Sequence, residues 1–312
     1  MKRYMKNGVF ALTLLSVGGF SSIAVAEVES EKPIKIAINE WTGQHLSANI
    51  AAELLKKMGY QVQLVTAGAL PQFTAIAQNE LDLNPEVWDN SVTDIYTDGL
   101  ASGKIVDLGE LGLEPKEGWI YPPYMAEKCP GLPDYQALYD CAEAFASAET
   151  FPNGRLVAYP ADWGTRSAAV IDAIDLPFTA VPGGSEGAMI AELKSAIASE
   201  EPILMMMWQP HWLFSQFELD SVEWNPIEGE CVEETQERET ACGFAQASVN
   251  KIVSSQLAVT WPGAAAFVEK FTLTNAEQNA MIFEVDQGGR ALEEVVQEWI
   301  DTNETKWSAW IK

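Results

Sequence analysis

Short apolar runs alternate with amphipathic stretches along most of this chain, and that alternation restricts its fold more than any other feature. A strand pattern at residues 34–38 precedes a helical pattern at 47–58, which ends at Gly59. Further strand patterns lie at 62–65, 156–159 and 202–207, and further helical patterns at 72–78 and 185–199. Strands separated by helices predict an α/β fold in which mainly parallel sheets are flanked by helices.

The chain has 312 residues, more than one ordinary hydrophobic core accommodates, so we expect two lobes. We place residues 27–122 in the first lobe and 123–246 in the second. Residues 247–312 then return to the first lobe as a helical C-terminal part, with helical patterns at 264–271, 276–287 and 291–302. The second lobe is therefore expected to be an insertion in the first.

Residues 1–26 have the composition of a cleavable secretory signal peptide. Lys2, Arg3 and Lys6 precede a short apolar run at residues 9–20, and Ala24 and Ala26 provide the small residues of a cleavage site. The apolar run is too short for a membrane span, and no later stretch is apolar enough to cross a bilayer. We expect cleavage near Ala26 and a mature protein in the periplasm, with no direct membrane insertion.

The chain is strongly acidic, with a formal charge of −26. After removal of the signal peptide, 16 basic residues remain against 45 acidic ones, which gives −29. Such a surface repels nucleic acid and anionic lipid, so neither is an expected partner. The charge favours solubility and, more weakly, a cationic or zwitterionic ligand.

Four cysteines form two local pairs, Cys129 with Cys141 and Cys231 with Cys242. Sequence alone allows three connectivities, of which bridging the near neighbours is the simplest. Neither spacing matches a zinc site. We therefore expect two structural disulfides, Cys129–Cys141 and Cys231–Cys242, in an oxidising compartment.

Four tryptophans stand where a binding cleft is expected. Trp41, Trp88, Trp163 and Trp208 each follow or end a strand-like run and have polar or turn-forming neighbours. Because ligands of α/β sheets sit outside the carboxyl ends of the strands, these four rings are expected at one rim. Several indole faces around one point suit a quaternary ammonium cation. The alternative is that they are core or rim aromatics.

Several segments resemble the substrate-binding proteins of ABC importers for glycine betaine, choline and related solutes. The most specific is Trp208-Gln209-Pro210-His211-Trp212, and residues 82–88, 159–164 and 38–42 match other cage segments of that family. The resemblance implies a type II periplasmic binding protein fold that closes about a hinge. Trp41 and Trp88 would come from the first lobe and Trp163 and Trp208 from the second. Choline binders of the family carry an acidic group two residues after the first Trp, where this chain has Gly43, so choline is disfavoured.

The oxygen end of the ligand would meet the segment after Trp163. Gly164, Thr165 and Arg166 precede an apolar helical run, and the free N–H groups at a helix start suit an anion. We expect the N–H groups of Gly164 and Thr165 to hold this oxygen, with Arg166 as a further candidate. His211 would either reach the same oxygen or orient its own turn. One of Trp119, Tyr121 and Tyr124 is expected to form a side wall.

The predicted function is therefore the binding component of an ABC importer, a monomer that delivers a small methylated amine to a membrane permease. Glycine betaine leads as ligand, trimethylamine N-oxide follows closely, and dimethylsulfoniopropionate, proline betaine and carnitine come next. A secreted serine hydrolase is the alternative, because residues 183–187 satisfy the pattern G-x-S-x-G around Ser185. Ser185 equally suits a helix N-cap, which we prefer. Motifs for a metal or a cofactor are not found, so we expect neither, and no enzyme.

Overall fold

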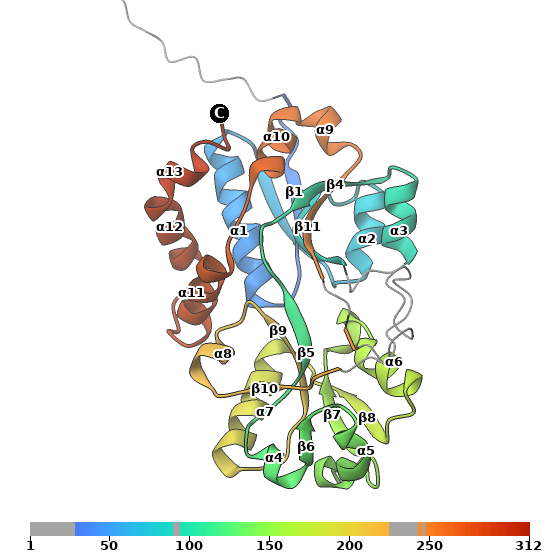
Figure 1. Ribbon diagram of the computed structural model, residues 1–312. Coiled ribbons are helices and arrows are strands. Elements are labelled where there is room, and N and C mark those ends of the chain that lie inside the picture. The colour runs from blue at the N-terminus through green and yellow to red at the C-terminus, as the bar shows by residue number, and fades with distance from the viewer. Residues whose placement is uncertain (1–28, 90–93, 225–242, 245–246) are drawn as a thin grey trace, which may run out of the picture.

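Two five-stranded sheets, each flanked by helices, form the two lobes of the protein (Figure 1). The computed structural model describes residues 29–89, 94–224, 243–244 and 247–312. The expected signal peptide and the expected Cys231–Cys242 bridge lie outside these residues. In the described chain, no helix combines the length and apolar character that a membrane span requires.

The first sheet has the order β2-β1-β3-β11-β4, and the predicted strand–helix alternation builds it. Its strands are β1 (Ile34–Ile38), β2 (Val62–Thr66), β3 (Leu83–Trp88), β4 (Ile105–Glu110) and β11 (Val249–Ser254). The helices between them are α1 (Thr42–Lys57), α2 (Pro71–Ala77) and α3 (Asp94–Ala101). Every residue of β3 is buried, so this strand runs through the core and ends at the cleft.

The second sheet has the order β10-β5-β9-β7-β8. Its strands are β5 (Lys116–Tyr121), β7 (Gly154–Ala158), β8 (Phe178–Pro182), β9 (Met205–Gln209) and β10 (Asp220–Ser221). Around them lie α4 (Met125–Lys128), β6 (Pro130–Pro133), α5 (Ala137–Cys141), the short 3-10 helices η2 (Ala142–Phe145) and η3 (Ala161–Trp163), α6 (Arg166–Ala173), α7 (Glu186–Ser199) and α8 (Leu213–Gln216).

Both sheets are mixed rather than mainly parallel. In the first, β1 pairs in parallel with β2 and β3, but β11 is antiparallel to β3 and β4. In the second, β7 pairs in parallel with β8 and β9, but β5 is antiparallel to β9 and β10. The antiparallel pairs involve β5 and β11, the strands that follow a crossing of the chain from one lobe to the other. A strand that follows such a crossing is not joined to its neighbour by the right-handed βαβ connection that makes neighbouring strands parallel.

The chain changes sheet earlier than the expected lobe boundary at residues 122 and 123, because β5 already belongs to the second sheet. The first sheet resumes with β11, which begins at Val249. After it, α9 (Leu257–Thr260), α10 (Pro262–Lys270), α11 (Asn275–Asp286), α12 (Leu292–Thr302) and α13 (Glu304–Trp307) complete the helical C-terminal part. Of these, α11 and α12 pack against α1 (Figure 1).

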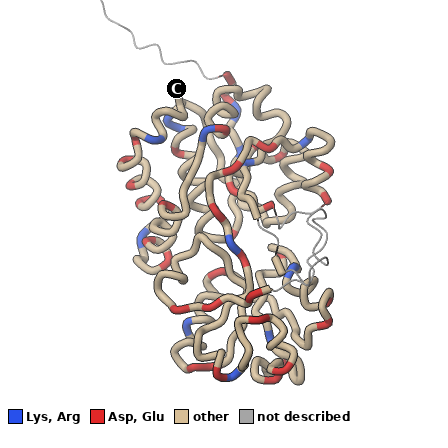
Figure 2. The backbone as a smooth tube through the Cα atoms, viewed as in Figure 1, with Lys and Arg blue, Asp and Glu red and all other residues tan. Residues whose placement is uncertain are grey.

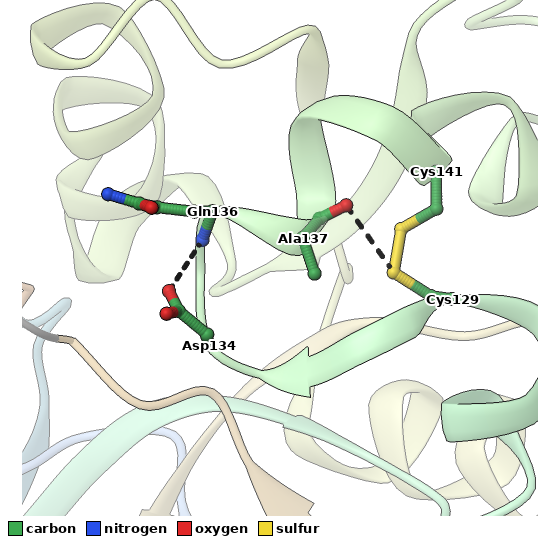
Figure 3. The surroundings of a disulfide bond; sticks show 5 residues. All are labelled: Cys129, Asp134, Gln136, Ala137 and Cys141. Carbon is green, nitrogen blue, oxygen red and sulfur yellow. Dashed lines mark hydrogen bonds between the residues drawn. A yellow bond between two sulfur atoms is a disulfide. The ribbon is translucent and has the colours of Figure 1, made fainter.

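The predicted Cys129–Cys141 disulfide is confirmed, and it closes the segment of β6 and α5 (Figure 3). Figure 2 shows acidic residues distributed over both lobes, with few basic residues among them. The acidity is therefore a property of the whole surface and does not single out one site.

Candidate functional site

One small cavity lies between the lobes, and all four predicted tryptophans line it. Its volume is about 50 Å³, room for a few water molecules or one small solute. The first lobe contributes Trp41, Ala69, Gln72, Phe73, Glu86, Val87 and Trp88, and the second contributes Glu117, Tyr159, Trp163 and Trp208. Trp41 precedes α1 directly, Trp88 ends β3, Trp163 ends η3, and Trp208 is the penultimate residue of β9.

The aromatic rings of the cavity contact one another at steep angles. Trp163 and Trp208 have ring centroids 5.6 Å apart, and the Tyr159 centroid is 5.7 Å from the first and 5.5 Å from the second. Trp41 of the first lobe lies 5.2 Å from Trp163 of the second, so the described arrangement is closed. Edge-to-face packing holds these rings as the walls of an apolar enclosure.

Glu86 is a cavity residue that sequence reasoning missed. Its side chain is buried, and its Oε1 accepts hydrogen bonds from Trp41 Nε1 at 2.9 Å and Trp88 Nε1 at 3.3 Å. Burial raises the pKa of this carboxyl above its ordinary value, and the hydrogen bonds that it accepts oppose only part of that rise. The signal was present in the sequence, because residues two apart on a strand point to the same face and Glu86 stands two before Trp88.

A second carboxylate, Glu117 on β5, borders the cavity from the other lobe. Its Oε1 accepts from the Tyr159 hydroxyl at 2.8 Å, and its Oε2 pairs with Arg166 Nη1 at 2.8 Å. Burial and the nearby Glu117 raise the pKa of Tyr159 well above its ordinary value. Arg166, predicted to hold the ligand's oxygen, is thus engaged with Glu117 and lies over the Phe244 ring.

The predicted helix start after Trp163 is confirmed at Thr165, the N-cap of α6. Gly164 has a backbone φ of 121°, which residues with a side chain rarely adopt, so the backbone conformation explains why this position is glycine. Neither Gly164 nor Thr165 lines the cavity, although both follow Trp163 directly. The buried Nε1 of Trp163 has no hydrogen-bond partner within the described residues.

His211 lies against Trp208, with ring centroids 5.2 Å apart, but does not line the cavity. Its Nδ1 accepts from the Leu213 backbone N–H at 3.2 Å, so the ring proton sits on Nε2, which faces Glu186 at 3.2 Å. This supports the orienting role that the sequence offered as one alternative. Its role in ligand binding stays a prediction.

Glu186, His211 and Asp286 place one possible metal-ligand atom each within 4.8 Å of the others. The tautomer of His211 does not fit an ion at Nε2, because metal binding requires the proton on Nδ1. The cluster instead belongs to a hydrogen-bonded junction between the lobes. Thr42 N donates to Glu186 at 2.8 Å, and Asp286 accepts from Thr42 Oγ1 at 2.8 Å and Trp212 Nε1 at 2.9 Å.

The remaining sequence candidates have structural positions. Ser185 is the N-cap of α7 and accepts from Ala188 N at 3.2 Å, as preferred over a nucleophile. None of Trp119, Tyr121 and Tyr124 borders the cavity between the lobes. Trp119 is instead fully buried and donates to Ser167, and Glu117 on the same strand faces the cavity.

Comparison with known proteins agrees with this architecture. A curated relative, the trimethylamine N-oxide-binding protein of Pelagibacter ubique, is 28% identical over 306 residues, covering 96% of each chain. Lactococcal OpuAC in its closed form with glycine betaine superposes with a TM-score of 0.73 at 21% identity, covering 90% of this chain and 100% of that one. An ABC-transporter choline-binding protein with choline gives a TM-score of 0.73 at 16% identity, covering 91% and 93%.

The two structural likenesses establish the two-lobed binding-protein fold. The family model described as the substrate-binding domain of ABC-type glycine betaine transport systems matches residues 32–302, nearly the whole chain that follows the expected signal peptide. The chain belongs to this family of ABC-importer substrate-binding domains.

Proposed function

We propose that this protein captures trimethylamine N-oxide between its lobes, in a cage of Trp41, Trp88, Trp163 and Trp208. The observation that carries the proposal is the cavity itself, which is small, aromatic and bordered by two carboxylates. A trimethylated nitrogen needs an apolar surface for its methyl groups and electron-rich faces for its positive charge, and indoles supply both.

The cage accounts for useful affinity without a salt bridge to the ligand. Each indole face contributes roughly 0.5–2 kcal/mol to binding of the cationic end. Four faces together with burial of the methyl groups bring the binding free energy to about −8 kcal/mol, which corresponds to a micromolar Kd.

The oxygen end favours trimethylamine N-oxide over glycine betaine, the ligand that the sequence ranked first. Among the residues that the structure describes, those lining this cavity include Glu86 and Glu117 but no Lys or Arg, and Arg166 is paired with Glu117. A ligand carboxylate would meet like charges there, whereas an N-oxide carries its oxygen directly on nitrogen and needs only one donor. The buried Trp163 Nε1 is available as that donor. The trimethylamine N-oxide-binding relative supports the same choice.

Glycine betaine is the second candidate, favoured by the start of α6. The N–H groups of Gly164 and Thr165 stand beside Trp163, and a carboxylate that reached them would gain from the helix N-terminus. A solved relative of the same fold holds glycine betaine. Choline remains disfavoured, because Gly43 offers no acidic group for its hydroxyl, and a Cβ at this position would lie tightly, at 3.3 Å, against Gln278 Nε2.

The proposed role in the cell follows from the family. The protein binds its ligand in the periplasm, closes about the hinge between its sheets, and presents the closed form to the permease of an ABC importer, acting as a monomer without catalysis. The interlobe bonds of Thr42 and Trp212 exist only when the lobes are together, so they give the permease a rigid closed form to recognise.

Calorimetric titration of residues 27–312 with trimethylamine N-oxide, glycine betaine and choline tests the proposal. We expect a micromolar Kd for trimethylamine N-oxide, weaker binding of glycine betaine and little binding of choline. Trp208→Ala should abolish the response. Trp299→Ala is the matched control, because this buried Trp lies on α12, away from the cavity.

Tight binding of glycine betaine with none of trimethylamine N-oxide would overturn the ligand assignment and leave the role intact. If the folded protein gives no binding signal with any of the three ligands, the tryptophan cage is refuted as a ligand site. Hydrolysis of an ester by the wild type that Ser185→Ala removes would refute the absence of catalysis.

A further inference from the structure

The carboxylate of Glu86 connects the two tryptophans of the first lobe. Both indole N–H groups donate to its Oε1, Trp41 from the start of α1 and Trp88 from the end of β3. We propose that Glu86 is the positioning residue and the counter-charge of the cage: it fixes the two indoles and supplies the negative charge that balances the ligand's cationic end. The counter-charge part rests on the proposed function.

The positioning part follows from the shared acceptor. Each indole is held at one side by its own backbone and at the other by its Nε1–H bond, so two indoles that share one acceptor oxygen restrain each other's position. Both rings and the carboxylate belong to the first lobe. Half of the cage is therefore assembled before the lobes close, which lowers the entropy cost of binding.

The other oxygen of Glu86 anchors the carboxylate to two further elements. Its Oε2 accepts from Ser47 Oγ on α1 at 2.6 Å and from Gln278 Nε2 on α11 at 2.7 Å. A Cβ at Gly43 would approach Gln278 Nε2 at 3.3 Å, so a side chain at this position would press on the anchor. The glycine at position 43 thus preserves the support of Glu86.

The counter-charge part follows from what surrounds the carboxylate. All four donors to Glu86 are neutral, and across the described residues no Lys, Arg or His pairs with it. A buried charge with no opposite partner is unfavourable. Glu86 borders the cavity, so a cation held against Trp41 and Trp88 becomes its partner. The other carboxylate there, Glu117, already has Arg166.

Charge discrimination tests this role, since a purely structural role would not affect it. Trimethylamine N-oxide is a zwitterion with a formally positive nitrogen, and its carbon isostere tert-butanol has nearly the same shape without formal charges. Glu86→Gln preserves the shape of the side chain while removing its charge. We expect Glu86→Gln to weaken trimethylamine N-oxide about tenfold to a hundredfold and tert-butanol by less than about threefold. Tetramethylammonium should follow trimethylamine N-oxide.

Asp82→Asn is the matched control. Asp82 is also buried and immediately precedes β3, about 13 Å along the chain direction from Glu86, where it accepts from Lys35 N. The same charge change there should leave both affinities unaltered. Equal losses of affinity for trimethylamine N-oxide and tert-butanol in Glu86→Gln, or an equal effect of Asp82→Asn, would overturn the counter-charge role.

A ligand-free measurement separates this proposal from the proposed function. In nitrogen-labelled protein, the Trp41 and Trp88 indole N–H signals, assigned with Trp41→Phe and Trp88→Phe, should be shifted downfield and protected from exchange. Indole N–H signals of the wild type with ordinary chemical shifts and rapid exchange would overturn the positioning role. This measurement uses only the wild type and the two Phe variants, so it does not depend on whether Glu86→Gln folds. If these signals are shifted but the wild type binds no methylated amine, the proposed function and the counter-charge role are refuted, and the positioning role stands.

Discussion

Trp212 joins the two lobes without lining the cavity, so its replacement separates lobe closure from ligand contact. Its indole Nε1, at the start of α8 in the second lobe, donates to Asp286 Oδ2 at 2.9 Å, and Asp286 ends α11 in the first lobe. Trp212→Phe keeps an aromatic ring beside His211 and Phe283 and removes this bond. We expect weaker binding of every ligand that requires closure.

The magnitude follows from the nature of the acceptor. A hydrogen bond to a charged group contributes about 1.5–3 kcal/mol, and Asp286 keeps only its bond from Thr42 in the variant. The Trp212–Asp286 bond forms only when the lobes meet, so its full loss appears in ligand binding. Because about 1.4 kcal/mol equals a factor of ten, the Kd should rise roughly tenfold to a hundredfold.

Calorimetric titration with trimethylamine N-oxide gives the Kd, and small-angle scattering at saturating ligand reports closure. The variant should reach the closed dimensions at higher ligand concentration. Trp261→Phe is the matched control, since the Trp261 Nε1 is buried in the first lobe without a partner in the described chain. A Kd for Trp212→Phe within about twofold of wild type, or an equal loss in Trp261→Phe, would refute the reasoning.

Three further predictions concern stability. Burial and the neighbouring Glu186 raise the pKa of Asp286, so its contribution to stability is present below the ordinary carboxyl pKa and is lost as pH rises through the raised one. The unfolding free energy of wild type relative to Asp286→Asn should therefore fall as pH rises above the ordinary carboxyl pKa, and a difference that stays constant with pH in denaturant titrations would contradict this. Burial lowers the pKa of Lys251 to about 8 from 10.5. The wild type should therefore gain roughly 3 kcal/mol of unfolding free energy relative to Lys251→Met as pH rises across that interval, and the absence of this gain would refute the lowered pKa. Replacing Cys129 and Cys141 together by Ser should lower the unfolding free energy by about 2–4 kcal/mol and leave the Kd unchanged, and an altered Kd would mean that this loop reaches the cleft.

The strand and helix pattern identified from the sequence corresponds closely to the elements formed. The 34–38 pattern became β1 and the 185–199 pattern became α7 with Ser185 as its cap, because periodicity and capping are local properties. The direction of β5 and β11 was not accessible in this way. Whether a crossing strand enters a sheet parallel or antiparallel depends on where the chain leaves the other lobe, which no local pattern records.

By itself, the sequence indicated that Trp41, Trp88, Trp163 and Trp208 share one rim, because each stands at or just past the end of an element and the topology of an α/β sheet brings such positions together. The Tyr159 ring, which completes the enclosure, was not among the predicted site residues. Only the tertiary structure decided the polar surroundings of those rings. Glu117 is one of 45 acidic residues and has no distinguishing motif, and the spacing of Glu86 and Trp88 places them on one face of a strand without showing what Glu86 contacts. Their roles arise because packing places Glu86 against indole N–H groups and Glu117 against Arg166, and the energetics of a buried charge depend on its partners in space.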